Sequence, residues 1–171
     1  MDLSLRWAEA ADLPLLLSGL ALVLVDGTDF LARSGAGAVD ATCAAYFSDW
    51  GRPDDRAVVA ERRADGHPLG IAWIRRPLGG GVPFIGLAVR PEARGQGVGA
   101  ALLRACQRDA MDHGHDLSLT VHCRNPALKL YRRCGFREIG LLDEPSTGPM
   151  VRMGWSLPRS GARASRRAPI Y

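Results

Sequence analysis

Three glycines, Gly95, Gly97 and Gly99, lie close together directly before a run of alanine and leucine. Glycine has no Cβ and adopts positive φ readily, so a ligand can approach the backbone of such a segment closely. The first N–H groups of a helix have no intrahelical partner, and the helix dipole adds partial positive charge there. The segment therefore predicts a site for a phosphate or pyrophosphate at a helix start. A tight turn whose glycines only allow close packing is the alternative.

Two familiar nucleotide-binding motifs do not fit this spacing. A P-loop has Lys and then Ser or Thr after its last glycine, whereas Gly99 is followed by Ala100 and Ala101. The dinucleotide fingerprint has the spacing G-x-G-x-x-G, whereas Gly95, Gly97 and Gly99 have the spacing G-x-G-x-G. The sequence therefore disfavours both the P-loop and the dinucleotide-binding folds.

The glycine segment lies between a predicted strand and a predicted helix. Residues 82–89 form an almost continuous apolar run of strand length, as expected for a strand buried on both faces. Downstream, apolar side chains recur at helical spacing, at Leu102, Leu103, Cys106 and Ala110. Gly114 suits the left-handed position that ends many helices. The predicted order is therefore strand, glycine loop and helix.

Further strands and helices surround this unit. Apolar patterns predict strands at residues 3–7, 56–62, 69–74, 117–123, 136–142 and 150–157. They predict helices at residues 10–24 and 39–47. Asn125 before Pro126 predicts another helix start, because the Asn side chain can cap a free N–H, and Gly135 predicts the end of that helix.

Length and composition are those of one soluble globular domain. The chain has 171 residues, of which 47% are hydrophobic and 23% charged. The apolar run at residues 13–25 contains Pro14, Ser18 and Gly19, and no uninterrupted apolar stretch reaches the roughly 18 residues of a membrane span. We therefore expect no membrane segment and no signal peptide.

Cysteine and histidine usage bears on compartment and metal binding. The four cysteines, Cys43, Cys106, Cys123 and Cys134, show no C-x-x-C spacing, which favours a reducing cytoplasm. His113 and His115 flank Gly114 without a nearby group of Cys or carboxylate residues. The sequence therefore predicts no metal site.

The net positive charge comes from the C-terminal end. Residues 158–171 contain four arginines and no acidic residue, against a formal charge of +4 for the whole chain. We expect a folded domain over residues 1–157 and a basic, flexible tail over residues 158–171. Nucleic-acid binding by this tail is the less favoured alternative to solvated disorder. Lys129 is the single lysine among the 22 basic residues, so arginine supplies the positive charge along the whole chain. An individual arginine near the glycine segment is therefore weak evidence for phosphate binding.

Two segments resemble the GNAT superfamily of acyl-CoA-dependent N-acyltransferases. The first, GLAVRPEARGQGVGAALL, resembles the family's R/Q-x-x-G-x-G/A segment and places Arg94, Gly97 and Gly99 at its defining positions. The second, NPALKLYRRCGF, is similar to a later family segment and carries Asn125, Tyr131, Gly135 and Phe136. The resemblance is specific over about residues 82–136 and faint before Arg56.

The resemblance implies a fold and a donor substrate. The fold would be a single α/β (α+β) domain with a mixed, mainly antiparallel, twisted sheet flanked by helices, opened between the strands ending near Val89 and beginning near Leu117. Acetyl-CoA would enter this opening as cosubstrate, with its pantetheine arm along Leu87, Ala88 and Val89. Its pyrophosphate would lie against Arg94, Gly95, Gln96, Gly97, Val98, Gly99 and Ala100. Asn125 would contact the arm, or would only cap its helix.

By the same resemblance, Tyr131 is the catalytic residue. A phenol with a pKa of about 10 can protonate the CoA thiolate as it leaves. Taken by periodicity alone, Tyr131 would only complete an apolar helix face. A general base is also needed, yet residues 84–89 and 117–123 contain no carboxylate. The open alternatives are His122, or a water molecule that passes the proton to Asp143, to Glu144 or to a residue between 26 and 49.

The predicted activity is transfer of an acetyl group to a primary amine of a small molecule or peptide. The amine would attack the thioester directly in a ternary complex, without a Cys or Ser nucleophile. A non-catalytic acyl-CoA sensor is the alternative, since the strand carboxylate is missing. We expect a cytoplasmic monomer or homodimer; the sequence does not identify the acceptor.

Overall fold

The computed structural model describes residues 2–158. The predicted tail therefore lies outside the described residues, apart from Pro158. The strands are β1 (Leu3–Trp7), β2 (Arg56–Arg62), β3 (Pro68–Arg75), β4 (Phe84–Val89), β5 (Leu117–His122), β6 (Arg137–Glu144) and β7 (Gly148–Trp155). The α-helices are α1 (Leu13–Gly27), α2 (Phe30–Ser34), α3 (Ala38–Tyr46), α4 (Val98–His113) and α5 (Leu128–Arg133). Short 3₁₀ turns, η1 (Ala10–Asp12) and η2 (Pro91–Ala93), precede α1 and α4.

All seven strands form one mixed sheet in the order β1-β2-β3-β4-β5-β7-β6. Neighbouring strands are antiparallel, except for β4 and β5, which are parallel. This arrangement confirms the predicted mixed, mainly antiparallel α/β fold.

The sheet opens between β4 and β5. Phe84 and Ser118 are the one residue pair that joins these two strands, and the Ser118 N–H donates to the Pro83 carbonyl at 2.8 Å. Beyond this point β4 continues to pair with β3 as far as Val89, and β5 pairs with β7 as far as His122. The facing edges of β4 and β5 therefore part toward their carboxyl ends, as the sequence interpretation expected.

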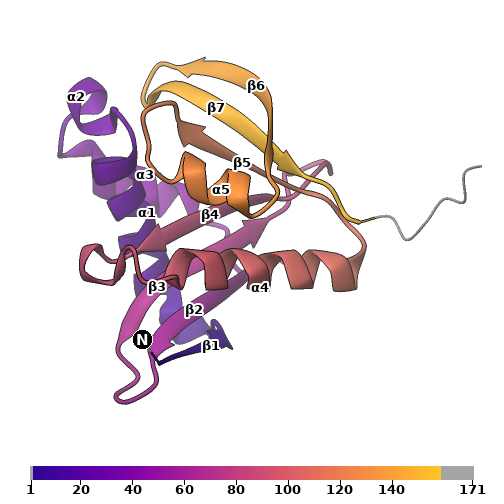
Figure 1. Ribbon diagram of the computed structural model, residues 1–171. Helices are drawn as coiled ribbons and strands as arrows, with labels where there is room; N and C mark the ends of the chain where they lie inside the picture. The colour runs from indigo at the N-terminus through magenta and orange to yellow at the C-terminus, as the bar shows by residue number, and fades with distance from the viewer. Residues whose placement is uncertain (1, 159–171) are drawn as a thin grey trace, which may run out of the picture.

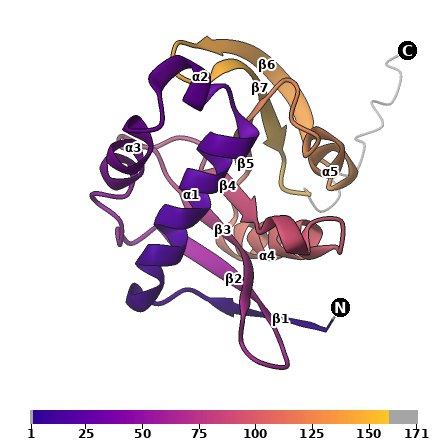
Figure 2. The same ribbon diagram turned by 90° about the vertical axis from the view of Figure 1, so that its left-hand side faces the viewer.

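Helices cover both faces of the sheet. On one face, α4 and α5 pack over a core that includes Leu102, Leu103 and Tyr131. On the other face, α1 and α3 pack over a second core that includes Leu16, Cys43 and Trp73. Figure 1 shows α4 crossing in front of the strands with α1 behind them, and Figure 2, turned by 90°, brings α1 to the viewer.

Helix α1 packs closely on the middle of the sheet. Leu16, Leu20 and Leu24 are buried one turn apart, which gives the helix its core-facing stripe. A Cβ at Gly19 would lie 2.8 Å from Ile71 Cγ2, so glycine permits the helix to approach β3 this closely.

The helical segment Ala10–Gly27 is long and apolar. Its 18 residues have a mean hydropathy of 1.7, so by length and composition it could cross a membrane, a test that the core helices of soluble proteins also pass. The sequence predicted a helix over residues 10–24, and the structure extends it to Gly27. Proline is tolerated in the first turn of a helix, and η1 runs directly into α1.

Several element boundaries differ from the sequence predictions. Helix α2 was not predicted, since a five-residue helix has too few positions to show periodicity. Helix α5 begins at Leu128 rather than directly after Asn125, because Pro126 and Ala127 form a turn first. The predicted helix ends at Gly114 and Gly135 are confirmed by φ values of +71° and +86°.

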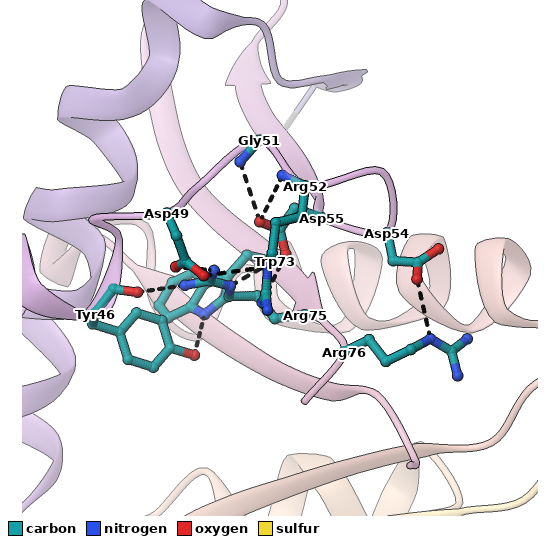
Figure 3. Close-up of polar contacts among 9 residues, drawn as sticks. All are labelled: Tyr46, Asp49, Gly51, Arg52, Asp54, Asp55, Trp73, Arg75 and Arg76. Atoms are coloured by element: carbon teal, nitrogen blue, oxygen red, sulfur yellow. Dashed lines mark hydrogen bonds and ion pairs between the residues drawn. The ribbon is translucent and has the colours of Figure 1, made fainter. Parts of the chain in front are cut away.

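One buried arginine ties α3 and the loop after it to the sheet. The Arg75 side chain at the end of β3 is 4% exposed, and its guanidinium lies 2.6 Å from Asp49 and 3.2 Å from Asp55. It also donates to the Tyr46 carbonyl and lies 5.6 Å from the centre of the Trp50 ring. Figure 3 shows Tyr46, Asp49 and Asp55 converging on Arg75. The cation therefore joins three chain segments in the second core.

Candidate active site

A pocket occupies the opening between β4 and β5. Its volume is about 530 Å³, within the range typical of small-molecule sites. Its walls come from β4, β5, the start of α4, the segment from Pro126 to Arg133 and the end of α1. The pocket therefore lies where the parted strands meet helices from both faces of the sheet.

The glycine loop forms one end of this pocket. Gly95 and Gly97 have φ values of +73° and +86°, and an added Cβ at either residue would meet no atom within 4 Å. Helix α4 begins at Val98, and its first bond runs from the Ala101 N–H to the Gly97 carbonyl at 3.0 Å. The N–H groups of Val98, Gly99 and Ala100 precede that bond, so the helix start offers free donors to an anion.

Arg94 lies beside this helix start and is already held by the protein. Its Nη2 lies 2.9 Å from Asp26 Oδ2 at the end of α1, and its Nε donates to the Val89 carbonyl at 3.2 Å. Both charged side chains are about half exposed. The ion pair therefore crosses the pocket between α1 and the glycine loop.

The structure brings together all but one of the residues predicted to bind the donor. The exception is Gln96, which does not line the pocket. Its exposed side chain donates to the Glu92 carbonyl at 2.7 Å instead. The residues that do line the pocket are Leu87, Ala88, Val89, Arg94, Gly95, Gly97, Val98, Gly99, Ala100 and Asn125, together with Tyr131.

Strand β4 presents bare backbone to the pocket at Gly86. A Cβ there would lie 2.1 Å from Trp73 Cζ2 on the neighbouring strand, so the indole ring leaves no room for a side chain. Leu87, Ala88 and Val89 follow along the edge that β5 does not pair. An extended ligand could add to this edge as a further strand would.

Asn125 links the two sides of the opening. Its Oδ1 accepts from the Ala127 N–H at 2.8 Å, and its Nδ2 donates to the Gly27 carbonyl at 3.2 Å. The first bond caps the turn before α5, and the second holds the end of α1. Asn125 thus lines the pocket while its side chain already makes hydrogen bonds within the protein.

Tyr131 is buried in the pocket wall. The residue is 7% exposed, and its ring packs edge-to-face on Phe136 with 6.1 Å between the ring centres. Burial raises the pKa of the phenol well above its usual value of 10.0. The phenol therefore stays protonated at neutral pH and is available as a donor.

His122 also lines the pocket, but both of its ring nitrogens face protein groups. Nδ1 accepts from the Arg124 N–H at 3.2 Å, so in the neutral ring the proton belongs on Nε2. Nε2 is fully buried and lies 3.3 Å from Asp29 Oδ2, without the alignment of a hydrogen bond. In this arrangement no ring nitrogen can take a proton from a molecule in the pocket.

Asp29 lies behind His122 and is held as a carboxylate. Burial is the largest single effect and opposes its charge, but the hydrogen bond from Arg124, at 2.7 Å, and the neighbouring charges together outweigh burial and lower the pKa of Asp29. Its backbone N–H donates to the Thr147 carbonyl at 3.1 Å. Asp29 therefore ties the α1–α2 connection to β5 and to the β6–β7 turn.

Of the other proposed bases, the segment of residues 26–49 reaches the pocket at Asp26, whereas the two carboxylates of β6 do not. Asp143 and Glu144 are exposed near the end of β6, and neither lines the pocket.

Among residues 2–158, no group of three or more His, Cys, Asp or Glu side chains is arranged to hold a metal ion.

The sequence interpretation left a possible base open between residues 26 and 49, but it did not single out the residues at the end of α1. Asp26, Gly27 and Thr28 line the pocket from a segment that shows no motif. Their place depends on contacts with Arg94 and Asn125, 68 and 98 residues further along the chain. The sequence offered one indication that this segment reaches the site, namely an aspartate at the end of a leucine-rich helix.

The strands β4 and β5 are parallel and part from each other, and a glycine-rich helix start lies between them. This is the arrangement expected from the resemblance to the GNAT superfamily. The model of the acetyltransferase (GNAT) family matches residues 28–136. The chain therefore belongs to this family.

Known proteins are similar to the chain over different lengths. A mycothiol acetyltransferase from Clavibacter sepedonicus is 38% identical over 87 residues, which are 50% of this chain and 28% of that protein. The chain thus spans less than a third of this curated relative. A GCN5-related N-acetyltransferase from Kribbella flavida is 30% identical, with a TM-score of 0.71 over 91% of this chain and 98% of its own. An acetyltransferase from Corynebacterium glutamicum, 23% identical, has a TM-score of 0.72 over 95% of this chain and 100% of its own, and supports the fold alone.

Proposed function

We propose that the chain transfers an acetyl group from acetyl-CoA to a primary amine of a small molecule or peptide. The observation that carries this proposal is the shared pocket of the α4 start, the unpaired β4 edge and Tyr131. The diphosphate would bind at Val98, Gly99 and Ala100, and the pantetheine arm would follow Leu87 to Val89. Gln96 would contribute at most its backbone N–H.

The proposed mechanism depends on positioning rather than on a covalent intermediate. The β4 edge would hold the thioester carbonyl, and a strand N–H would meet the carbonyl oxygen as negative charge develops. The neutral amine attacks the carbonyl carbon, a C–N bond forms, and the C–S bond breaks with its electron pair going to sulfur. Tyr131 protonates the departing thiolate and regains a proton that the attacking nitrogen loses.

Thiol release tests this function directly. Purified chain, acetyl-CoA and a panel of primary amines are combined, and free CoA thiol is measured with a chromogenic disulfide. We expect release that depends on both the amine and the protein. No release with any amine, despite measurable CoA binding, would favour the second candidate, a non-catalytic acyl-CoA sensor. The engaged nitrogens of His122 are the observation that favours that candidate.

A Gly97→Ala substitution should weaken CoA binding. Alanine at a φ of +86° costs about 1–2 kcal/mol, so the loop is expected to leave the conformation that aims its N–H groups into the pocket. We expect a roughly 10-fold higher Kd by calorimetry. Gly114→Ala is the matched control, because Gly114 also has positive φ, +71°, but ends α4 away from the pocket. Equal losses in both variants would contradict a role for Gly97 in binding.

An Asp26→Asn substitution should strengthen CoA binding. The Asp26 carboxylate lies 2.9 Å from Arg94 and would compete with a diphosphate for this guanidinium. Because both groups are partly exposed, we expect a modest effect, about 2- to 5-fold in Kd at low salt. The gain should shrink at high ionic strength, where the charges are screened. A weaker complex at every salt concentration would show that Asp26 supports binding instead.

A further inference from the structure

The pocket contains few groups that could take a proton from an amine. The titratable side chains that line it are Asp26, Arg94, His122, Tyr131 and Arg133. Residues 159–171, which the structure does not describe, contain no Asp, Glu or His. A general base for the acceptor would therefore have to be Asp26 or His122, or lie outside the pocket.

Neither candidate base is placed to act on the acceptor. Asp26 pairs with Arg94 at 2.9 Å at the end of the pocket formed by the glycine loop. His122 has Nδ1 occupied by a backbone N–H and Nε2 buried against Asp29. Proton transfer from the pocket through His122 to Asp29 would require a ring nitrogen with its lone pair directed into the pocket. Neither ring nitrogen of His122 meets this requirement.

The remaining charged groups disfavour an ammonium ion. Arg94 and Arg133 line the pocket, against the single carboxylate of Asp26. Arg124 lies next to His122 and holds Asp29 at 2.7 Å, so that carboxylate is already neutralised. Tyr131 is a proton donor in this environment, because burial raises its pKa. A charged amine would thus meet positive potential and find no group to deprotonate it.

We propose that the acceptor is an amine that is largely neutral near pH 7 to 8, such as the α-amine of an amino acid derivative or a peptide, and not an alkyl amine of the lysine type. This inference depends on the proposed acetyl transfer. An α-amino group has a pKa of about 7.7–8.0 and a lysine side chain about 10.4. At pH 7 the neutral fraction of the α-amine is therefore larger by about two orders of magnitude. The solvent, rather than the enzyme, would remove the proton before the amine binds.

Two isomers of monoacetylated lysine amide test this proposal. Nε-acetyl-lysine amide has a free α-amine, whereas Nα-acetyl-lysine amide has a free ε-amine, and the two have the same atoms. We expect log kcat/KM for thiol release to rise with pH with a slope of one and to level at the acceptor's own pKa. The levelling point should therefore lie near pH 8 for the first isomer and near pH 10 for the second. At pH 7 the first should be the better substrate by about 100-fold.

The variants Asp26→Asn and His122→Gln complete the test. Each is expected to change the rate while leaving the pH at which the profile levels unchanged. A levelling point shared by both isomers, or one that either variant removes, would identify a base on the enzyme and overturn the proposal. A preference for the ε-amine at pH 7 would do the same. Binding of CoA without turnover of either isomer would instead count against the acetyltransferase reaction itself, and the acceptor class would fall with it.

Discussion

Replacement of Tyr131 by phenylalanine is expected to lower kcat by about 100-fold, the lower end of the range for loss of a general acid. The phenol lines the pocket, is 7% exposed and is protonated at neutral pH because burial raises its pKa. Phenylalanine keeps the ring and its edge contact with Phe136 and removes only the hydroxyl. Steady-state thiol release with saturating acetyl-CoA measures the change.

Binding and folding provide the controls for this variant. The Kd for CoA should stay within about 2-fold of the unsubstituted chain, because the hydroxyl is proposed to act on the departing thiolate and not on the bound ground state. The urea midpoint should also stay unchanged, since the ring and its contact with Phe136 are kept. An unchanged kcat would remove Tyr131 from the mechanism.

Replacement of Arg75 by methionine is expected to lower the free energy of unfolding by about 3–5 kcal/mol. The Asp55 side chain is 1% exposed and would lose the cation that lies 3.2 Å from it. The Tyr46 carbonyl and Asp49 would lose their donor at the same time. Methionine has a similar length and fills the space, so the effect reports the lost charge rather than a cavity. Urea unfolding followed by tryptophan fluorescence measures it.

The neighbouring Arg76 is the matched control. It pairs with Asp54 at 3.3 Å, but the two side chains are 36% and 65% exposed, and Figure 3 shows this pair apart from the buried group. Arg76→Met should therefore change the free energy of unfolding by less than about 1 kcal/mol. If the two variants were destabilised equally, the buried cluster would have no special role in holding α3 and its loop.

Local patterns were enough to predict most of the fold. The strands at residues 3–7 and 56–62 and the helix ends at Gly114 and Gly135 follow from apolar periodicity and glycine conformation, and the structure confirms them. The opening between β4 and β5 was expected only through the resemblance to a family. No pattern within one segment specifies how far two strands remain paired.

Contacts between distant segments could not be read from the sequence. Arg75 ends an apolar strand after Trp73, while Asp49, Asp54 and Asp55 lie in an earlier loop. Among so many arginines, nothing in the sequence set Arg75 apart. Its role depends on burial by α3, which the sequence predicted as a helix but could not place.

The candidate site was predicted unevenly for the same reason. The glycine loop, the β4 edge and Tyr131 carry motifs within single segments, and the structure gathers them around one pocket. Asp26 and Thr28 carry no motif and reach the pocket because Asn125 holds the end of α1. For His122, the residue type suggested a base, whereas its surroundings leave no ring nitrogen free for one.

Calorimetric titration of CoA into the full chain tests whether the glycine loop and the β4 edge hold the acetyl donor, because binding can be measured without the correct acceptor. We expect a single site per chain, a Kd in the micromolar range, and competition by the 3′,5′-ADP portion of the molecule. The affinity should fall as salt is raised, since the ligand is an anion. Absence of heat at millimolar CoA, together with no competition from any CoA thioester, would contradict this account of the pocket.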